Sequence, residues 1–269
     1  MNILLQKMGL NLKNLSILMN KFNSNVLDAV AAAAPNMPKK LLSLGTTNAK
    51  TAKNEIKTFI LYLMPYNQNS KGKQLCPHAS KGCAAACLVS AGRGSFSNVI
   101  KARVNKTEIF IKYKYEFLNK LSEEIIQETA KANRGSYRVA FRLNGTSDVD
   151  FIYLLKKYRF LDIETLKPHA VFYDYTKNIK KAIRYKTHPN YTVTFSRAED
   201  NALQTALAIK HGINVAAVFN ELPNTWSGVK VVDGDASDLQ MLKFNGVILG
   251  LKAKGAARKD TTGFTIKNR

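Results

Sequence analysis

The sequence predicts an α/β protein whose core is a parallel sheet. A complete or partial parallel (β/α) barrel is the first expectation, and an open sheet is the alternative. Short apolar runs rich in β-branched and aromatic residues recur along the chain, and helical segments separate several of them. The runs are nearly continuous in hydrophobicity, as strands buried on both faces are. Strands of this kind that alternate with helices form parallel sheets covered by those helices.

The N-terminal part differs from the rest of the chain. Apolar residues recur at helical spacing between residues 3 and 32, and Pro35 and Pro38 end this pattern. We therefore expect residues 1–44 to form a helical N-terminal extension. Residues 45–269 are then expected to form the barrel-like domain.

The elements of this domain follow one another in a simple order. The first predicted strand covers residues 57–65, and the segment that contains the cysteines comes directly after it. A helical stripe covers residues 97–132 and ends at a glycine-containing turn. Another clear helix covers residues 200–211. The remaining predicted strands cover residues 137–143, 169–175, 191–195, 214–219, 230–233 and 246–251.

The balance of charge is strongly basic. The chain has 41 Lys and Arg against 19 Asp and Glu, a net charge of +22, which favours a nucleic acid or nucleotide as partner. A compositional bias of the source genome would also produce a lysine-rich surface. No apolar stretch approaches the roughly 18 residues of a membrane span, and no secretory signal is evident. We expect no membrane association and a cytoplasmic location, and the sequence predicts no oligomeric state.

All three cysteines, Cys76, Cys83 and Cys87, lie in the segment CPHASKGCAAAC. In a reducing compartment, clustered thiols are more often ligands or reactive groups than disulfide partners. Three thiolates can hold a [4Fe-4S] cluster with one open iron, which binds S-adenosylmethionine for radical chemistry. Zinc is an alternative, with His78 as a fourth ligand. A third possibility is that the thiols pack among the neighbouring alanines without a metal.

Polar side chains follow almost every predicted strand. Because the carboxyl ends of parallel strands meet at one edge, these side chains are expected to surround one site. Single residues of these types are also common as helix caps and in turns. The candidates to act on or orient a substrate are Asp148, Asp174, Lys177 and Asp233. The candidates to hold a nucleotide-like cofactor are Asn144, Ser196 and Glu199.

Five basic residues are candidates for contact with nucleic acid phosphates. They are Arg93, which lies between two glycines, and Lys252, Lys254, Arg258 and Lys259 near the C-terminus. The alternatives are an ordinary loop before the helix and a solvated chain end.

Several separated motifs occur in a characteristic order from about residue 45 onward. They are CPHASKGCAAACLVSAGRG, RLNGTSDVDF, VFYDYTKN, TFSRAE, VVDGDASD and VILGLKAKGAARKDTTGF. Together they resemble an uncharacterised family of bacteriophage proteins, distantly similar to the phage gene product 88 group. The resemblance implies a phage origin, hence the host cytoplasm, and a shared site. It implies no particular reaction.

A second resemblance concerns architecture. In radical S-adenosylmethionine enzymes, a loop with three cysteines follows the first strand of a partial barrel, and here the cysteines follow the first predicted strand. The spacing Cys-x6-Cys-x3-Cys departs from the Cys-x3-Cys-x2-Cys usual in that superfamily.

The leading hypothesis is a phage-type enzyme that acts on a nucleic acid or nucleotide through an iron-sulfur cluster and S-adenosylmethionine. One alternative is a base-exchanging transglycosylase-like enzyme with structural zinc, in which Asp148 and Asp233 supply the nucleophile and the acid/base. The other alternative is a non-enzymatic, basic DNA-binding accessory protein.

Overall fold

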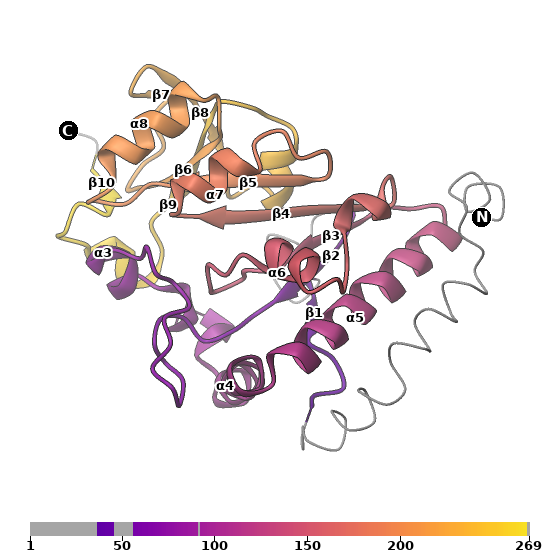
Figure 1. Cartoon of the computed structure of the whole chain (residues 1–269). Helices are drawn as coiled ribbons and strands as arrows, with labels where there is room; N and C mark the ends of the chain where they lie inside the picture. The colour runs from indigo at the N-terminus through magenta and orange to yellow at the C-terminus, as the bar shows by residue number, and fades with distance from the viewer. Residues whose placement is uncertain (1–36, 46–55, 91, 268–269) are drawn as a thin grey trace, which may run out of the picture.

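The computed structural model describes residues 37–45, 56–90 and 92–267, and in this part of the chain the fold is built on a ten-stranded, mainly parallel sheet (Figure 1). The strand order is β1-β2-β3-β4-β5-β6-β9-β8-β7, and β10 pairs with β6. The strands are β1 (Leu42–Leu44), β2 (Lys57–Leu61), β3 (Val139–Arg142), β4 (Ala170–Thr176), β5 (Tyr191–Ser196), β6 (Val215–Phe219), β7 (Thr225–Trp226), β8 (Val229–Asp233), β9 (Ile248–Lys252) and β10 (Thr265–Ile266).

Helices connect the parallel strands. The α-helices are α3 (Lys81–Ala85), α4 (Ser97–Lys112), α5 (Lys114–Arg134), α6 (Phe151–Lys157), α7 (Ile179–Arg184) and α8 (Ala202–Lys210). The short 3-10 helices are η2 (Leu88–Ser90), η3 (Gly92–Ser95), η4 (Ile163–Leu166), η5 (Asp238–Leu242) and η6 (Gly255–Lys259). In the described residues, none of the helices is long and apolar enough to cross a membrane.

The prediction of alternating strands and helices is confirmed, whereas a complete barrel is wrong. The sheet does not close, because β1 lies at one edge and β7 at the other. The sequential order of β2 to β6 is one that a (β/α) barrel and an open sheet share. The helix predicted over residues 97–132 is two helices, because Tyr113 leaves the helical conformation at φ −127° and ψ 60°.

Most of the predicted N-terminal extension lies outside the described residues. The last part of the range 1–44 contains strand β1, which pairs antiparallel with β2. Leu42–Leu44 therefore belongs to the sheet and extends it at the edge.

The two faces of the sheet are covered differently. The larger hydrophobic core lies on the face where α4, α5, α6, α7 and α8 pack. Three phenylalanines in register on adjacent strands, Phe59, Phe141 and Phe172, stack across this face with ring centroids 5.7 and 5.1 Å apart. Such pairs add to the stabilisation that burial of the rings provides. The opposite face has a smaller core, in which Leu239 and Met241 of η5 pack. One face is thus closed by helices, and the other leaves room at the strand ends.

A buried carboxylate fixes the edge of the sheet. Glu124 of α5 accepts hydrogen bonds from the backbone N–H groups of Leu41 (2.7 Å) and Leu42 (2.9 Å). The ammonium of Lys106 on α4 donates to the Leu41 carbonyl at 3.1 Å. Burial, together with the nearby charge of Arg103, lowers the pKa of Lys106 to about 8.

We predict that Glu124→Gln destabilises the protein by about 1–3 kcal/mol, because an amide oxygen cannot replace both carboxylate oxygens and a buried N–H loses its partner. Urea unfolding measures the change. The matched control is Glu123→Gln at the neighbouring exposed position, which should change the free energy of unfolding by less than about 0.5 kcal/mol. Equal effects of the two substitutions would contradict this account.

A cysteine-lined cavity at the strand ends

A cavity of about 450 Å³ opens at the carboxyl ends of the parallel strands. Its volume lies in the range of small-molecule sites, and its position is the one where parallel α/β sheets bind ligands. The lining residues that carry polar or ionisable side chains are Tyr66, Cys76, Cys83, Cys87, Arg142, Asn144, Thr146, Ser147, Asp148, Tyr175, Thr176, Lys177, Ser196, Asp235, Asp238, Lys252 and Lys254.

The three cysteines all face this cavity, as their clustering in the sequence suggested. Each is half-buried, and none forms a disulfide. The Tyr66 hydroxyl hydrogen-bonds with the Cys83 thiol. Burial raises the pKa of this phenol, and the three nearby cysteines raise it further. Tyr66 has a left-handed backbone, with φ 54°, a conformation that is strained for a residue with a side chain. The three thiols and this phenol therefore gather at one wall of the cavity.

Hydrogen bonds to Glu199, which follows β5, hold the cysteine segment in place. Ser80 is the N-cap of α3 and accepts from the Cys83 N–H at 3.0 Å. The Ser80 hydroxyl and the Gly82 N–H both donate to the Glu199 carboxylate at 2.7 Å. A side chain at Gly82 would lie 2.6 Å from the β-carbon of Phe264, so only glycine fits. Glu199, predicted to hold a cofactor, thus fixes the loop that contains the thiols.

Burial governs the ionisation of these groups. It raises the pKa of the Cys76 thiol to about 11. Burial also raises the pKa of Cys87, although the positive charges of Arg103 and Lys177 oppose this effect. Burial opposes ionisation of Glu199 as well, but the hydrogen bonds from Gly82 and Ser80 outweigh it and lower the pKa of that carboxyl.

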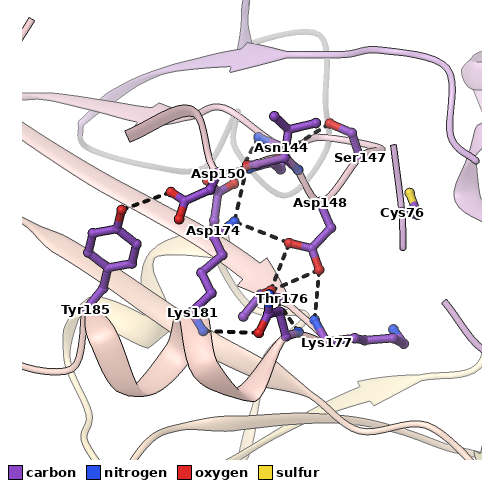
Figure 2. Close-up of polar contacts among 12 residues, drawn as sticks. Cys76, Asn144, Ser147, Asp148, Asp150, Asp174, Thr176, Lys177, Lys181 and Tyr185 are labelled. Carbon is purple, nitrogen blue, oxygen red and sulfur yellow. Dashed lines mark hydrogen bonds and ion pairs between the residues drawn. The ribbon is translucent and has the colours of Figure 1, made fainter. Parts of the chain in front are cut away.

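Asp174 is an internal support rather than part of the cavity wall. Its side chain is buried and accepts from the backbone N–H of Asn144 (2.9 Å) and the Asn144 amide (3.0 Å) (Figure 2). It also accepts from the Tyr191 hydroxyl at 3.2 Å. Asn144 in turn accepts from Ser147 and from the Val149 N–H. The loop after β3 is therefore shaped by one buried carboxylate.

Asp148 lies on this loop and lines the cavity. Its carboxylate accepts from the Thr176 hydroxyl (2.8 and 2.9 Å), the Lys177 N–H (3.0 Å) and the ammonium of the buried Lys181 (3.2 Å) (Figure 2). These contacts join the loop after β3 to the loop after β4. A carboxylate with this many donors is well suited to orient its neighbours, and its oxygens are largely committed.

Lys177 and Ser196 meet across two strand ends. The Lys177 ammonium donates to the Ser196 hydroxyl at 3.1 Å and lies 5.6 Å from the centre of the Phe264 ring. Burial raises the pKa of the nearby Cys87 thiol, and the positive charge of Lys177 opposes that rise. Lys177 therefore provides a positive charge beside the thiols.

The remaining predicted residues are divided between the cavity and the outer surface. Lys252 and Lys254 line the cavity, and Lys254 forms an ion pair with Asp235 at 2.9 Å. Four others are exposed and do not line it: His78, Arg93, Arg258 and Lys259. Asp233 is likewise exposed and outside the lining, so the structure does not bring it to Asp148 in the cavity.

A site for a single metal ion and a site for an iron-sulfur cluster need different arrangements of ligands. In the part of the chain that the structure describes, no three His, Cys, Asp or Glu side chains converge closely enough to hold a metal ion. The thiolates of a [4Fe-4S] cluster bind different iron atoms and lie farther apart than the ligands of one ion. Three half-buried thiols that face one cavity and form no disulfide are the type of donor that a [4Fe-4S] cluster uses.

The sequence analysis missed several residues of the cavity. Tyr66, Arg142 and Tyr175 all line it. Arg142 carried a usable signal, because it is a charged residue inside a predicted apolar strand. Tyr66 carried none, since its left-handed backbone becomes visible only in three dimensions.

The chain matches the model of a phage protein family over most of its length. The model of the family described as Gene product 88 matches residues 40–268. The chain belongs to this family, which confirms the resemblance seen in its motifs. Neither a curated protein nor a solved structure matches the chain. The resemblance to radical S-adenosylmethionine enzymes remains a prediction.

We predict that Glu199→Ala loosens the cysteine segment. Hydrogen bonds to charged groups contribute about 1.5–3 kcal/mol each, so losing two should accelerate alkylation of Cys83 by iodoacetamide at least tenfold. Mass spectrometry of the modified peptide measures the rate. Asp200→Asn, at the next and exposed position, is the control and should leave the rate unchanged. An unchanged rate in Glu199→Ala would show that other contacts hold the loop.

We predict that Cys76, studied in a Cys83→Ser, Cys87→Ser variant, titrates near pH 11 in the folded protein and near 9 after unfolding. The folded state keeps this proton longer, so its contribution to stability is present below pH 9 and is lost as the pH rises to 11. At pH 8 the thiolate fraction, and with it the alkylation rate, should be about a hundredfold lower than in urea. Thiolate absorbance follows the titration, and equal midpoints in both states would refute the effect of burial.

Proposed function

We propose that this protein is an enzyme that modifies a nucleotide or a nucleic acid in the cavity at the strand ends, with an iron-sulfur cluster held by Cys76, Cys83 and Cys87. The observation that supports the proposal best is that all three thiols face one ligand-sized cavity at the edge where parallel sheets place their active sites.

The surroundings of the thiols support this assignment. Their segment is fixed by Glu199 and by the close packing of Gly82, so the ligands would be preorganised before a cluster binds. A bound cluster with one open iron would supply electrons to S-adenosylmethionine for radical chemistry. Around it, Lys177 would hold a negatively charged group of the ligand. Asp148 would keep the backbone of that lysine in place, and Ser196 would keep its side chain in place.

The charge of the protein supports the choice of substrate. Lys177 and Lys252 line the cavity, and neither forms an ion pair within the described residues. Exposed Arg258 and Lys259 follow closely in the chain on η6. Together with the net charge of +22, these residues would attract phosphates. Phosphate contacts of this kind suit a nucleotide and a nucleic acid strand alike.

We expect the protein purified without oxygen to be brown and to contain iron and sulfide in comparable amounts. Cys83→Ala should remove most of the colour and iron, because a cluster held by two thiolates is no longer fixed. His78→Ala is the matched control in the same segment, because His78 is exposed and outside the cavity lining. Iron that is absent from the wild-type protein, or unchanged in Cys83→Ala, would refute the cluster.

A further inference from the structure

A charged pair lies in the deep part of the cavity, away from the cysteines in the sequence. Arg142 at the end of β3 and Asp238 at the start of η5 form an ion pair, with Nη1 and Oδ2 3.2 Å apart. The guanidinium lies over the ring of Tyr175, 4.9 Å from its centre. Their side chains are only 15% and 3% exposed, compared with 51% for Lys254. We call Arg142, Tyr175 and Asp238 the deep group.

The cavity wall beside the deep group is largely apolar. Ala216, Val218 and Leu251 line the cavity from β6 and β9. Removing an ion pair from water costs free energy that a hydrophobic pair of the same volume would not cost. A ligand site, by contrast, has mostly apolar walls and a few polar groups that select the ligand. The deep group and the apolar residues beside it have this pattern of a ligand site.

In the described residues, unused hydrogen-bonding capacity lies on the arginine side of the ion pair. In the described part of the chain, Arg142 Nε and the Tyr173 hydroxyl are buried without a hydrogen-bond partner. The two residues are neighbours across β3 and β4, because Phe141 is in register with Phe172. Buried donors without partners are costly and rare. A ligand that draws the guanidinium slightly toward the cavity would give Nε an acceptor.

The charges indicate which part of a ligand belongs there. Arg142 and Asp238 together are neutral, so a phosphate placed beside them would face the Asp238 carboxylate. A neutral ring that offers both acceptors and donors avoids this repulsion. Lys177 and Lys252, which line the same cavity, are the better partners of a phosphate. The cavity therefore separates a neutral, deep part from a positively charged part.

We propose that the deep group recognises the edge of a guanine or cytosine ring, an inference that rests on the nucleotide substrate of the proposed function. Arg142 donates to two adjacent acceptors, O6 and N7 of guanine or N3 and O2 of cytosine. Asp238 accepts from the N–H groups beside them. Adenine and uracil do not place two adjacent acceptors next to a donor, so the pair discriminates against both bases. Tyr175 supplies a flat surface next to the ring.

The test is calorimetric titration of the full chain at low salt with the 5′-monophosphates of guanosine, cytidine, adenosine and uridine, and with ribose 5-phosphate. Guanosine or cytidine monophosphate should bind at least tenfold more tightly than the other two nucleotides. Ribose 5-phosphate should bind more weakly than any preferred nucleotide, because it contacts only the lysines. Equal affinities for all five probes, or binding of none, would overturn the proposal.

Variants of the deep group test whether Arg142 and Asp238 cause the base preference. Arg142→Lys keeps the charge but removes the planar fork, so the base preference should be lost while affinity for ribose 5-phosphate stays the same. Asp238→Asn, of nearly the same shape, should lose the preference too, which covers the case in which Arg142→Lys does not fold. The control is Arg258→Lys, an exposed residue outside the cavity lining. A preference that survives in a folded Arg142→Lys or Asp238→Asn protein would overturn the proposal.

Iron analysis of the same preparations distinguishes failure of the base-recognition proposal from failure of the iron-sulfur proposal. A brown protein without base preference would overturn the inference alone. A colourless protein with the preference would overturn the cluster and leave the recognition of the base intact.

Discussion

The buried carboxylate of Asp174 is the contact on which the geometry of the cavity depends. It fixes the backbone and side chain of Asn144, and Asn144 fixes Ser147 and Val149 (Figure 2). The N–H of Asp148, between those two residues, donates to the Leu75 carbonyl at 2.8 Å. Asp174 on β4 thus fixes the loop after β3, and this loop in turn fixes Leu75, the residue before Cys76. Burial raises the pKa of Asp174, and the charges of Lys181 and Arg142 and the bonds from Asn144 oppose that rise.

A second anchor reaches the same cysteine segment from the other side of the cavity. Glu199 holds α3, and Arg197, two residues earlier, donates to the backbone carbonyls of Gly263 and Phe264. The Asp260 carboxylate shapes the turn before Phe264 through bonds to Thr262, Gly263 and Thr265. Segments that lie far apart in the sequence therefore converge on the short helix α3, in which every residue except Lys81 is small. A segment with so few large side chains has little core of its own, so its shape depends on these outside contacts.

The sequence predicted the edge at which the site forms but not the role of each residue there. Asn144, Asp148 and Lys177 follow parallel strands and Ser196 is the last residue of one, so all four line the cavity. The alternation of side chains within β4 could have corrected the role of Asp174. Phe172 belongs to the helix-covered core and Tyr173 to the opposite face, so Asp174 points toward the helices.

The same alternation in β3 places Arg142 on the cavity face, since Phe141 belongs to the helix-covered core. Two other features, the contact between Glu199 and Ser80 and the open edges of the sheet, could not be predicted from the sequence. The contact between Glu199 and Ser80 joins residues 119 positions apart, and no local pattern encodes it. Closure of the sheet depends on strand tilt and on its edges, and short apolar runs contain no information about either.

The large positive charge and the neutral deep group have different physical roles. Long-range attraction by exposed lysines and arginines accelerates encounter with any polyanion and weakens as salt screens it. The paired charges of Arg142 and Asp238 cancel at a distance, so they contribute nothing to that attraction. Inside a cavity with apolar walls, however, hydrogen bonds to this pair lose less strength to solvent. Attraction of a phosphorylated ligand and selection among bases can therefore be separated in this molecule, because salt should weaken the first much more than the second.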